Sequence, residues 1–337
     1  MRRQFLKTCA LIVVLIFLLS SMIFSQPGFS IRDKYDKQEV YITMRDGVRL
    51  FTSIYTPKND SVKHPILMNR TPYDIEGGGP DRYNNYLIVY SRFTKENYIM
   101  VFQDVRGKFM SEGNYEDIRP IIPDKKSNKD VDESTDIWDT VDWLIKNVKN
   151  NNGNVGIFGV SYPGFYSTMG LINAHPAVKA VSPQAPVTAW FLGDDVHHNG
   201  AFFLLDCFPF DFSFGMPRRG LTRTGNPGFV WPIPDNYEFF LSAGAIRNLS
   251  PKYFGDSVRF WKETFEHPDY DDFWKSRDPQ QYLKNVTPAV MTVGGWFDAE
   301  DLYGALHTYQ SIERQNSSST KNYLVMGPWY HGQWMFG

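Results

Sequence analysis

The sequence has little cysteine and almost no net charge. Its 337 residues include two cysteines, Cys9 and Cys207, and carry a formal net charge of −2. Cys9 lies in the N-terminal leader described next, so the rest of the chain has a single thiol, forms no internal disulfide and depends on packing for stability. The balanced charge gives no indication of binding to nucleic acid or to an anionic membrane surface. We therefore expect a small-molecule partner.

The chain also lacks an apolar run long enough to be a clear membrane span. Residues 10–24 are apolar and follow the basic residues Arg2, Arg3 and Lys7, but a transmembrane helix needs about 20 apolar residues. This pattern is typical of a signal peptide, which we place at residues 1–25. The sequence thus predicts a secreted or periplasmic protein with no stable membrane association after cleavage. A retained N-terminal anchor is the alternative.

No internal repeat is visible, and hydrophobic residues make up 42% of the sequence, enough for a large core. Two alternating runs within residues 38–56 meet at Asp46 and Gly47, which predicts a β-hairpin. Beyond it, strands are expected to alternate with helices, which is typical of a doubly wound, mainly parallel sheet. The strands are expected at residues 65–68, 98–103, 155–160, 289–293 and 323–326, and the helices at residues 132–148, 162–172 and 300–313. Ser134 and Thr135 offer capping hydroxyls at the start of the first helix.

The alternation breaks over residues 188–285, a stretch dense in Phe, Trp, Pro and Asp. We interpret this stretch as a helical cap inserted into an α/β domain. The domain would then consist of residues 26–187 and residues 286–337.

Ser161 has the surroundings of a catalytic nucleophile. It lies in Gly-Val-Ser-Tyr-Pro-Gly, residues 159–164, between an expected strand and an expected helix. That context is typical of a nucleophile elbow, in which small residues allow a sharp turn that exposes the serine. The general motif has glycine two residues after the serine, whereas this chain has Pro163 there and Gly164 next. The alternative is a serine in an ordinary tight turn.

A serine nucleophile needs a base and a carboxylate that orients it. Asp298 follows the expected strand at residues 289–293, and His331 follows the one at residues 323–326. Both leave the carboxyl ends of strands, and the chain order Ser, Asp, His is that of α/β-hydrolases. The remaining histidines lack this setting and are interpreted as surface or packing residues: His64, His175, His197, His198, His267 and His307. No spacing typical of metal ligands accompanies them, so we expect neither a metal nor another cofactor.

The oxyanion formed during acyl transfer needs two hydrogen-bond donors. One is expected from the backbone N–H of Tyr162, the residue after the nucleophile. The second candidate is the phenol of Tyr73, which follows the strand at residues 65–68. A purely structural tyrosine in a proline turn is the alternative for Tyr73.

Several motifs together resemble those of one superfamily, which comprises X-prolyl dipeptidyl peptidases, bacterial cocaine esterase and α-amino-acid ester hydrolases. They are Arg-Asp-Gly-Val-Arg-Leu (45–50), Arg-Thr-Pro-Tyr-Asp (70–74), Gln-Asp-Val-Arg-Gly (103–107), the elbow, Gly-Trp-Phe-Asp (295–298) and Gly-Pro-Trp-Tyr-His (327–331). The resemblance implies an α/β-hydrolase fold and a serine hydrolase. Members carry a C-terminal β-sandwich of jelly-roll type. Since this sequence ends shortly after His331, the resemblance implies that this domain is absent and that the second part of the hydrolase domain is truncated.

Within the superfamily the chain looks most like the α-amino-acid ester hydrolases. The resemblance implies that Asp195, Glu300 and Asp301 hold the α-ammonium of the substrate, with Asp194 as an alternative to Asp195. Acidic residues also favour the first turn of a helix, which is the ordinary explanation for Glu300 and Asp301.

The expected activity is transfer of the acyl group of an α-amino-acid ester or amide through an acyl-enzyme. An X-prolyl dipeptidyl peptidase, a cocaine-esterase-like enzyme and a non-catalytic binding fragment are the alternatives. A homo-oligomer is compatible with the sequence, as is a monomer.

Overall fold

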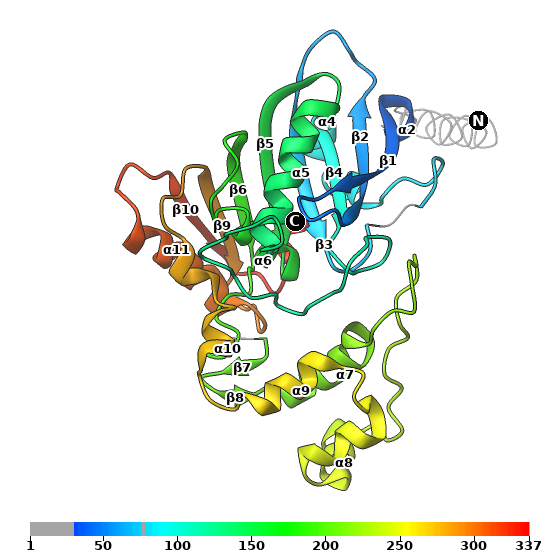
Figure 1. Ribbon diagram of the computed structural model, residues 1–337, viewed down its shortest axis with the longest axis vertical. Helices are drawn as coiled ribbons and strands as arrows, with labels where there is room; N and C mark the ends of the chain where they lie inside the picture. The colour runs from blue at the N-terminus through cyan, green and yellow to red at the C-terminus, as the bar shows by residue number, and fades with distance from the viewer. Residues whose placement is uncertain (1–29, 76–77, 194, 337) are drawn as a thin grey trace, which may run out of the picture.

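The computed structural model describes residues 30–75, 78–193 and 195–336. The predicted signal peptide, residues 1–25, lies outside this range. Figure 1 shows a twisted sheet with helices packed against it and a smaller lobe beyond one end. Among the described residues, no helix has both the length and the apolar character needed to cross a membrane.

One eight-stranded sheet forms the centre of the fold, in the order β1-β2-β4-β3-β5-β6-β9-β10. β1 pairs antiparallel with β2, and β2 with β4, whereas every other neighbouring pair is parallel. The predicted α/β-hydrolase sheet and the hairpin at Asp46 and Gly47 are therefore confirmed. The strands are β1 (Tyr35–Thr43), β2 (Arg49–Pro57), β3 (His64–Thr71), β4 (Ile99–Asp104), β5 (Asn151–Val160), β6 (Val178–Gln184), β9 (Ala289–Gly295) and β10 (Asn322–Gly327).

The main helices form where they are predicted. They are α5 (Glu133–Asn147), α6 (Tyr162–Met169) and α11 (Leu302–Gln315), while shorter ones are α2 (Ile31–Lys34), α3 (Tyr86–Val89) and α4 (Ser91–Lys95). The expected capping of α5 is confirmed for the Thr135 hydroxyl, but the N-cap residue itself is neither Ser134 nor Thr135. Asp132 is the N-cap, and its carboxylate accepts from the Thr135 N–H at 3.1 Å. Asp132 has the extended backbone of a cap, whereas Ser134 and Thr135 already lie in the first helical turn. Thr135 Oγ1 completes a capping box by accepting from the Asp132 N–H.

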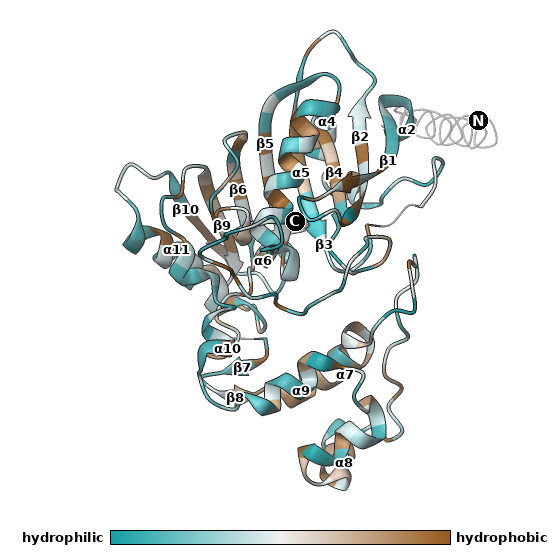
Figure 2. Ribbon diagram, viewed as in Figure 1, coloured by the Kyte–Doolittle hydropathy of each residue, from teal (hydrophilic) through white to brown (hydrophobic). Residues whose placement is uncertain are grey.

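Apolar side chains from the sheet and the helices form the core. α5 contributes Ile137, Val141 and Leu144, which are spaced along one helix face and pack in the same cluster as Ile66 and Val101 of the central strands. Figure 2 shows hydrophobic residues along these strands and hydrophilic residues on the outer loops. The exposed positions of α5 include Lys146 and Asn147, and also Trp138, which is 36% exposed.

A group of buried charges joins α5 to the sheet. Arg70 on β3 is only 2% exposed, and its Nη1 lies 3.1 Å from Glu133 Oε2. Arg106, just after β4, donates to Asp136 at 2.6 Å and to Asp46 in the hairpin turn at 2.7 Å. Nη2 of Arg70 lies 3.8 Å from Asp136, so this carboxylate is shared by both cations. The acidic first turn of α5 is thus fixed to two strands and to the hairpin.

The segment between β6 and β9 forms the smaller lobe, which has the several short helices expected of the cap. Its elements are β7 (His197–His198), β8 (Ala201–Phe202), α7 (Leu204–Phe210), the π-helical turn η1 (Asp211–Gly215), α8 (Asn236–Ala243), η2 (Ile246–Asn248), η3 (Ser250–Phe254), α9 (Arg259–Glu266), α10 (Asp272–Lys275) and η4 (Pro279–Tyr282). Phe208 is fully buried here among the rings of Phe229, Phe239 and Trp261. Aromatic rings therefore pack this lobe, in a cluster that is continuous with the core of the α/β domain.

Asp136→Ala leaves two buried cations short of a partner. We expect the free energy of unfolding to fall by about 3–5 kcal/mol, the usual effect of breaking a buried ion pair from one side. Urea titration followed by tryptophan fluorescence measures it. The control is Lys146→Ala, which breaks the exposed pair with Asp142 and should cost at most about 0.5 kcal/mol. Equal losses in the two variants would contradict a central role for the buried charges.

Candidate active site

Ser161 occupies a strained turn between β5 and α6. Its backbone has φ 68° and ψ −130°, a combination that side-chain-bearing residues rarely adopt. The turn is tight because a Cβ on Gly159 would lie 2.3 Å from the Pro163 carbonyl oxygen, and one on Gly164 would lie 2.5 Å from the Gln184 carbonyl oxygen. Glycine is therefore required on both sides of the serine. This is the geometry of the nucleophile elbow predicted from the sequence.

Asp298 and His331 form a hydrogen-bonded pair at the ends of β9 and β10. Nδ1 of His331 lies 3.0 and 3.1 Å from the two carboxylate oxygens of Asp298. The Asp298 side chain is buried and also accepts from the N–H groups of Glu300 and Asp301, each at 2.9 Å. With its proton on Nδ1, the ring donates to Asp298 and keeps Nε2 available as an acceptor.

Asp298 and His331 shift each other's pKa values in opposite directions. Burial alone would lower the pKa of His331, but the hydrogen bond to Asp298 and the charges of Asp298, Glu300 and Asp195 raise it above the ordinary value. Burial acts in the opposite sense on Asp298, and there the hydrogen bonds from His331, Asp301 and Glu300 hold the pKa below its ordinary value. The carboxylate thus stays ionised and stabilises an imidazolium.

Ser161 and His331 line the same cavity, which has a volume of about 320 Å³. Tyr73 forms another part of its wall, and Tyr86 and Tyr90 bring aromatic surface. The structure therefore brings the predicted nucleophile, the predicted base and one predicted oxyanion donor to a single hollow. A cavity of this size suits a small organic substrate.

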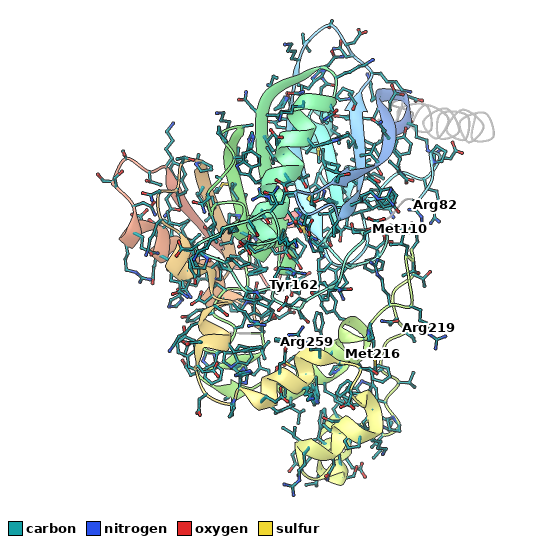
Figure 3. All side chains as sticks on the ribbon, in the orientation of Figure 1. Arg82, Met110, Tyr162, Met216, Arg219 and Arg259 are labelled. Atoms are coloured by element: carbon teal, nitrogen blue, oxygen red, sulfur yellow. The ribbon has the colours of Figure 1, made fainter. Side chains whose placement is uncertain are left out.

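The two residues predicted to supply the oxyanion donors, Tyr73 and Tyr162, have neighbouring rings. The N–H of Tyr162 opens α6 directly after Ser161, and the Tyr162 ring meets the Tyr73 ring edge to face at 6.4 Å. Figure 3 places Tyr162 between the sheet and the cap. Tyr73 remains 45% exposed because it faces open cavities. Although the cavities leave the side chain partly exposed, the protein atoms packed around the phenol desolvate it, and this desolvation, followed by the charges of Asp195 and nearby carboxylates, raises its pKa well above its ordinary value. The phenol consequently keeps its proton and can donate.

The acidic residues implied by the resemblance lie near His331. Glu300 Oε2 lies 3.7 Å from His331 Nε2, and Asp301 Oδ2 lies 3.7 Å from His331 Nδ1. Asp195, which has φ 74°, is close enough to raise the pKa of both His331 and Tyr73. Asp301 is the N-cap residue of α11, so the ordinary helix-end explanation applies to it as well. Asp194 lies outside the described residues.

This negative group could attract either an ammonium or a metal ion. One potential ligand atom each from Glu300, Asp301 and His331 lies within 4.8 Å of the others. A metal on His331 Nε2 would occupy the nitrogen that a general base needs. The sequence-based expectation of no metal therefore stays a prediction, and it is compatible with these residues acting on an ammonium.

The other histidines have structural surroundings. His197 is buried among the rings of Phe191, Phe202 and Trp274, and burial lowers its pKa to about 4. The remaining ones make local contacts: His64 with the Asn59 carbonyl, His175 with Asp142, His198 with the Phe203 ring, His267 with Asp271, and His307 with the Tyr303 carbonyl. These contacts explain the residues without catalysis.

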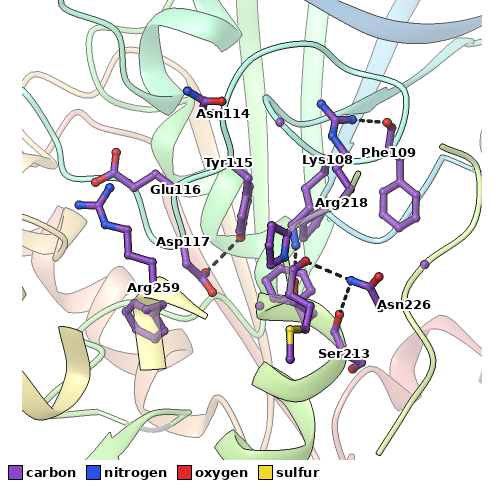
Figure 4. A pocket seen from close by; sticks show the side chains of 18 of the residues that line it. Lys108, Phe109, Asn114, Tyr115, Glu116, Asp117, Ser213, Arg218, Asn226 and Arg259 are labelled. Atoms are coloured by element: carbon purple, nitrogen blue, oxygen red, sulfur yellow. Dashed lines mark hydrogen bonds between the residues drawn. The ribbon is translucent and has the colours of Figure 1, made fainter. Parts of the chain in front are cut away.

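Sequence reasoning missed a second cavity and the loop that lines it. This cavity, of about 630 Å³, lies between the cap and residues 107–117 and shares Tyr73 with the first one. Figure 4 shows Lys108, Tyr115 and Asp117 in its wall, with Arg259 from the cap nearby. No periodic pattern or known motif marks Tyr115 or Asp117 in the sequence. They come near the site only through the tertiary fold.

Comparisons with known proteins agree with this geometry. The chain is 28% identical to a cocaine esterase from Rhodococcus sp. (strain MB1 Bresler), over 87% of this chain and 48% of the relative. An aminopeptidase structure from the marine sediment archaeon Thaumarchaeota archaeon aligns with TM-score 0.80 and 35% identity, over 90% of this chain and 49% of that one. An α-amino acid ester hydrolase structure aligns with TM-score 0.79 and 37% identity, over 90% and 49%.

The chain thus spans about half the length of the relatives that it matches. A family model described as X-Pro dipeptidyl-peptidase (S15 family) matches residues 46–333, which is most of the sequence. The chain therefore belongs to the X-Pro dipeptidyl-peptidase (S15) family of serine hydrolases.

Proposed function

We propose that this protein is a secreted hydrolase that cleaves α-amino-acid esters or amides through an acyl-enzyme. One observation carries the proposal: Ser161, on its strained turn, and His331, paired with Asp298, open on one cavity. Nucleophile, base and orienting carboxylate are the three parts that serine acyl transfer requires. Secretion rests on the signal-peptide pattern of residues 1–25.

In the first half of the reaction, Ser161 Oγ attacks the substrate carbonyl carbon while His331 Nε2 takes the hydroxyl proton. The Tyr162 N–H and the Tyr73 phenol donate to the oxyanion of the tetrahedral intermediate. Asp298 stabilises the imidazolium. Collapse of the intermediate breaks the bond to the leaving alcohol or amine, which receives the proton from His331.

In the second half, His331 takes a proton from water, which attacks the acyl-enzyme through a second tetrahedral intermediate. Collapse of this intermediate breaks the bond to Ser161 Oγ, which receives the proton back from His331, and the acid is released. An amine that reaches the acyl-enzyme first would take the acyl group and form an amide. The same residues would thus support both hydrolysis and acyl transfer.

The α-amino group is inferred from the charges around the site. Asp195, Glu300 and Asp301 carry negative charge near His331, which would favour an ammonium over a neutral or anionic group in the acyl part of a substrate. Two of the similar structures, an aminopeptidase and an α-amino acid ester hydrolase, carry names that refer to substrates with an amino group. The likeness to a cocaine esterase favours the alternative of a cocaine-esterase-like enzyme.

Ser161→Ala removes the nucleophilic oxygen and keeps the fold of the elbow. We expect turnover of p-nitrophenyl and methyl esters to fall by at least about 10³-fold, as in other serine hydrolases that lose this group. A fluorophosphonate probe should label the wild-type protein and leave the variant unlabelled. Full activity in the variant would exclude the mechanism, and an unlabelled wild type would favour a non-catalytic binding protein.

Asp195→Asn tests ammonium recognition with little change of shape, because asparagine tolerates the positive φ of this position. We expect kcat/KM for phenylglycine methyl ester to fall about tenfold, or about 1.4 kcal/mol. The rate for the des-amino ester should stay unchanged. Asp256→Asn, at an exposed cap position, is the matched control. Equal wild-type rates for the two esters would rule out the ammonium site, and loss of activity on treatment with EDTA would point to a metal instead.

The raised pKa of His331 predicts the pH dependence of the reaction. The base acts only when neutral, so kcat/KM should rise with pH through an apparent pKa above the ordinary value of 6.5. Glu300→Gln removes one of the charges that favour the imidazolium, and its profile should shift to lower pH. Rate measurements from pH 5 to pH 9 test this shift. A shift to higher pH would contradict the assigned base.

A further inference from the structure

The hydroxyl of Tyr162 is held by a loop that sequence reasoning did not connect with the site. It donates to Asp117 Oδ1, lies 3.0 Å from the Tyr115 hydroxyl, and accepts from the N–H of Ile118 at 2.9 Å. Tyr115 also contacts the same oxygen of Asp117 at 3.1 Å, as Figure 4 shows. One phenol therefore has three polar partners from four consecutive positions of the chain.

The backbone of this loop is strained where it meets Tyr162. Ile118 has φ 47°, in the left-handed region that β-branched residues avoid. It is nonetheless buried, and its N–H points at the Tyr162 oxygen. Strain of this kind persists only where surrounding contacts enforce it, and it is frequent at functional sites.

The ring of Tyr162 transmits this constraint because it has little freedom to move. It stacks on Tyr166 at 5.2 Å with an interplanar angle of 4°, and it packs against Trp190 at 5.4 Å. Phe214 of the cap contacts both Tyr162 and Tyr73, with centroids 5.6 Å from each. A ring fixed at its hydroxyl and on its faces also fixes the backbone from which it extends.

That backbone includes the N–H that follows Ser161. We propose that Asp117, Tyr115 and the Ile118 N–H form a clamp on the Tyr162 hydroxyl that positions the Tyr162 N–H for the oxyanion. The clamp residues touch neither substrate oxygen nor nucleophile, so they are positioning residues. The inference rests on the proposed function, because it assumes that an oxyanion forms beside Tyr162.

Tyr162→Phe removes the clamped hydroxyl and leaves the ring and the N–H. Loss of an entire oxyanion donor costs about 10²–10³-fold in kcat, and a donor that is only misaligned should cost about tenfold. We expect this tenfold loss in kcat for a p-nitrophenyl ester with KM nearly unchanged, since the donor acts in the transition state. An unchanged kcat, or a loss confined to KM, would overturn the clamp.

Asp117 provides the second arm of the test. Asp117→Asn keeps an oxygen that accepts from Tyr162 and should retain most of the wild-type kcat, whereas Asp117→Ala should lose about tenfold. Combined with Tyr162→Phe, Asp117→Ala should add little further loss, because both changes break the same hydrogen bond. Independent losses that multiply to about a hundredfold would overturn the coupling on which the clamp depends.

Tyr35→Phe is the matched control for losing a buried phenol. Tyr35 is fully buried in β1, where its hydroxyl donates to the carbonyl oxygens of Thr94 and Tyr98 at 3.0 and 2.8 Å. The Tyr35→Phe variant should lower the thermal midpoint of unfolding about as much as Tyr162→Phe does, and it should leave kcat unchanged. An equal loss of kcat in this control would make the effect of Tyr162→Phe one of general stability and overturn the clamp.

The outcomes separate the two proposals. A p-nitrophenyl ester forms an oxyanion whether or not the enzyme prefers an α-amino group, so the clamp test does not depend on ammonium recognition. Activity that survives Ser161→Ala would reject the proposed function. Activity that depends on Ser161 but not on the Tyr162 hydroxyl would reject the clamp alone.

Discussion

The buried charge group of Arg70, Arg106, Glu133 and Asp136 is the interaction on which the arrangement of the domain depends. It joins two neighbouring strands to the start of α5 in a region from which water is excluded. Buried ions are stable only when each has a partner in good geometry. The network therefore restricts how α5 can be placed against the sheet. The guanidinium of Arg70 also lies 5.7 Å from the Tyr166 ring, on the helix that begins beside Ser161. The position of the elbow and the packing of the sheet are therefore linked.

The sheet then gathers the reactive groups. Parallel strands end on one edge, so residues far apart in the sequence meet there once the strand order is set. Tyr73 follows β3, Ser161 follows β5, Asp298 follows β9 and His331 follows β10. The cap adds apolar surface to this edge through Phe214, which contacts Tyr73, Tyr115 and Tyr162. The catalytic residues at the sheet edge and the cap that covers them are thus in contact through a layer of aromatic rings.

The sequence was sufficient to predict what depends on local pattern. The elbow, the hairpin and the strand ends that carry Asp298 and His331 each follow from residues close together in the chain. The Thr135 hydroxyl caps α5 as expected, but the N-cap residue is Asp132, because Asp132, Ser134 and Thr135 are all good capping residues and backbone conformation decides among them. The roles of Asp117 and Tyr115 were not predicted from the sequence, because they arise from contacts with Tyr162, more than forty positions away. A single sequence has no periodic signal for such contacts.

The positive φ of Ser161 has a consequence for how such a site evolves. Glycine adopts this conformation readily, whereas any residue with a Cβ is strained in it. Natural selection for catalysis and selection for a stable fold therefore act in opposite directions on this codon. A lineage that stopped using the chemistry would lose nothing by replacing the serine with glycine, and it would relieve the strain in the turn. Glycine at this position in a descendant would thus mark a protein that kept the scaffold and gave up the reaction.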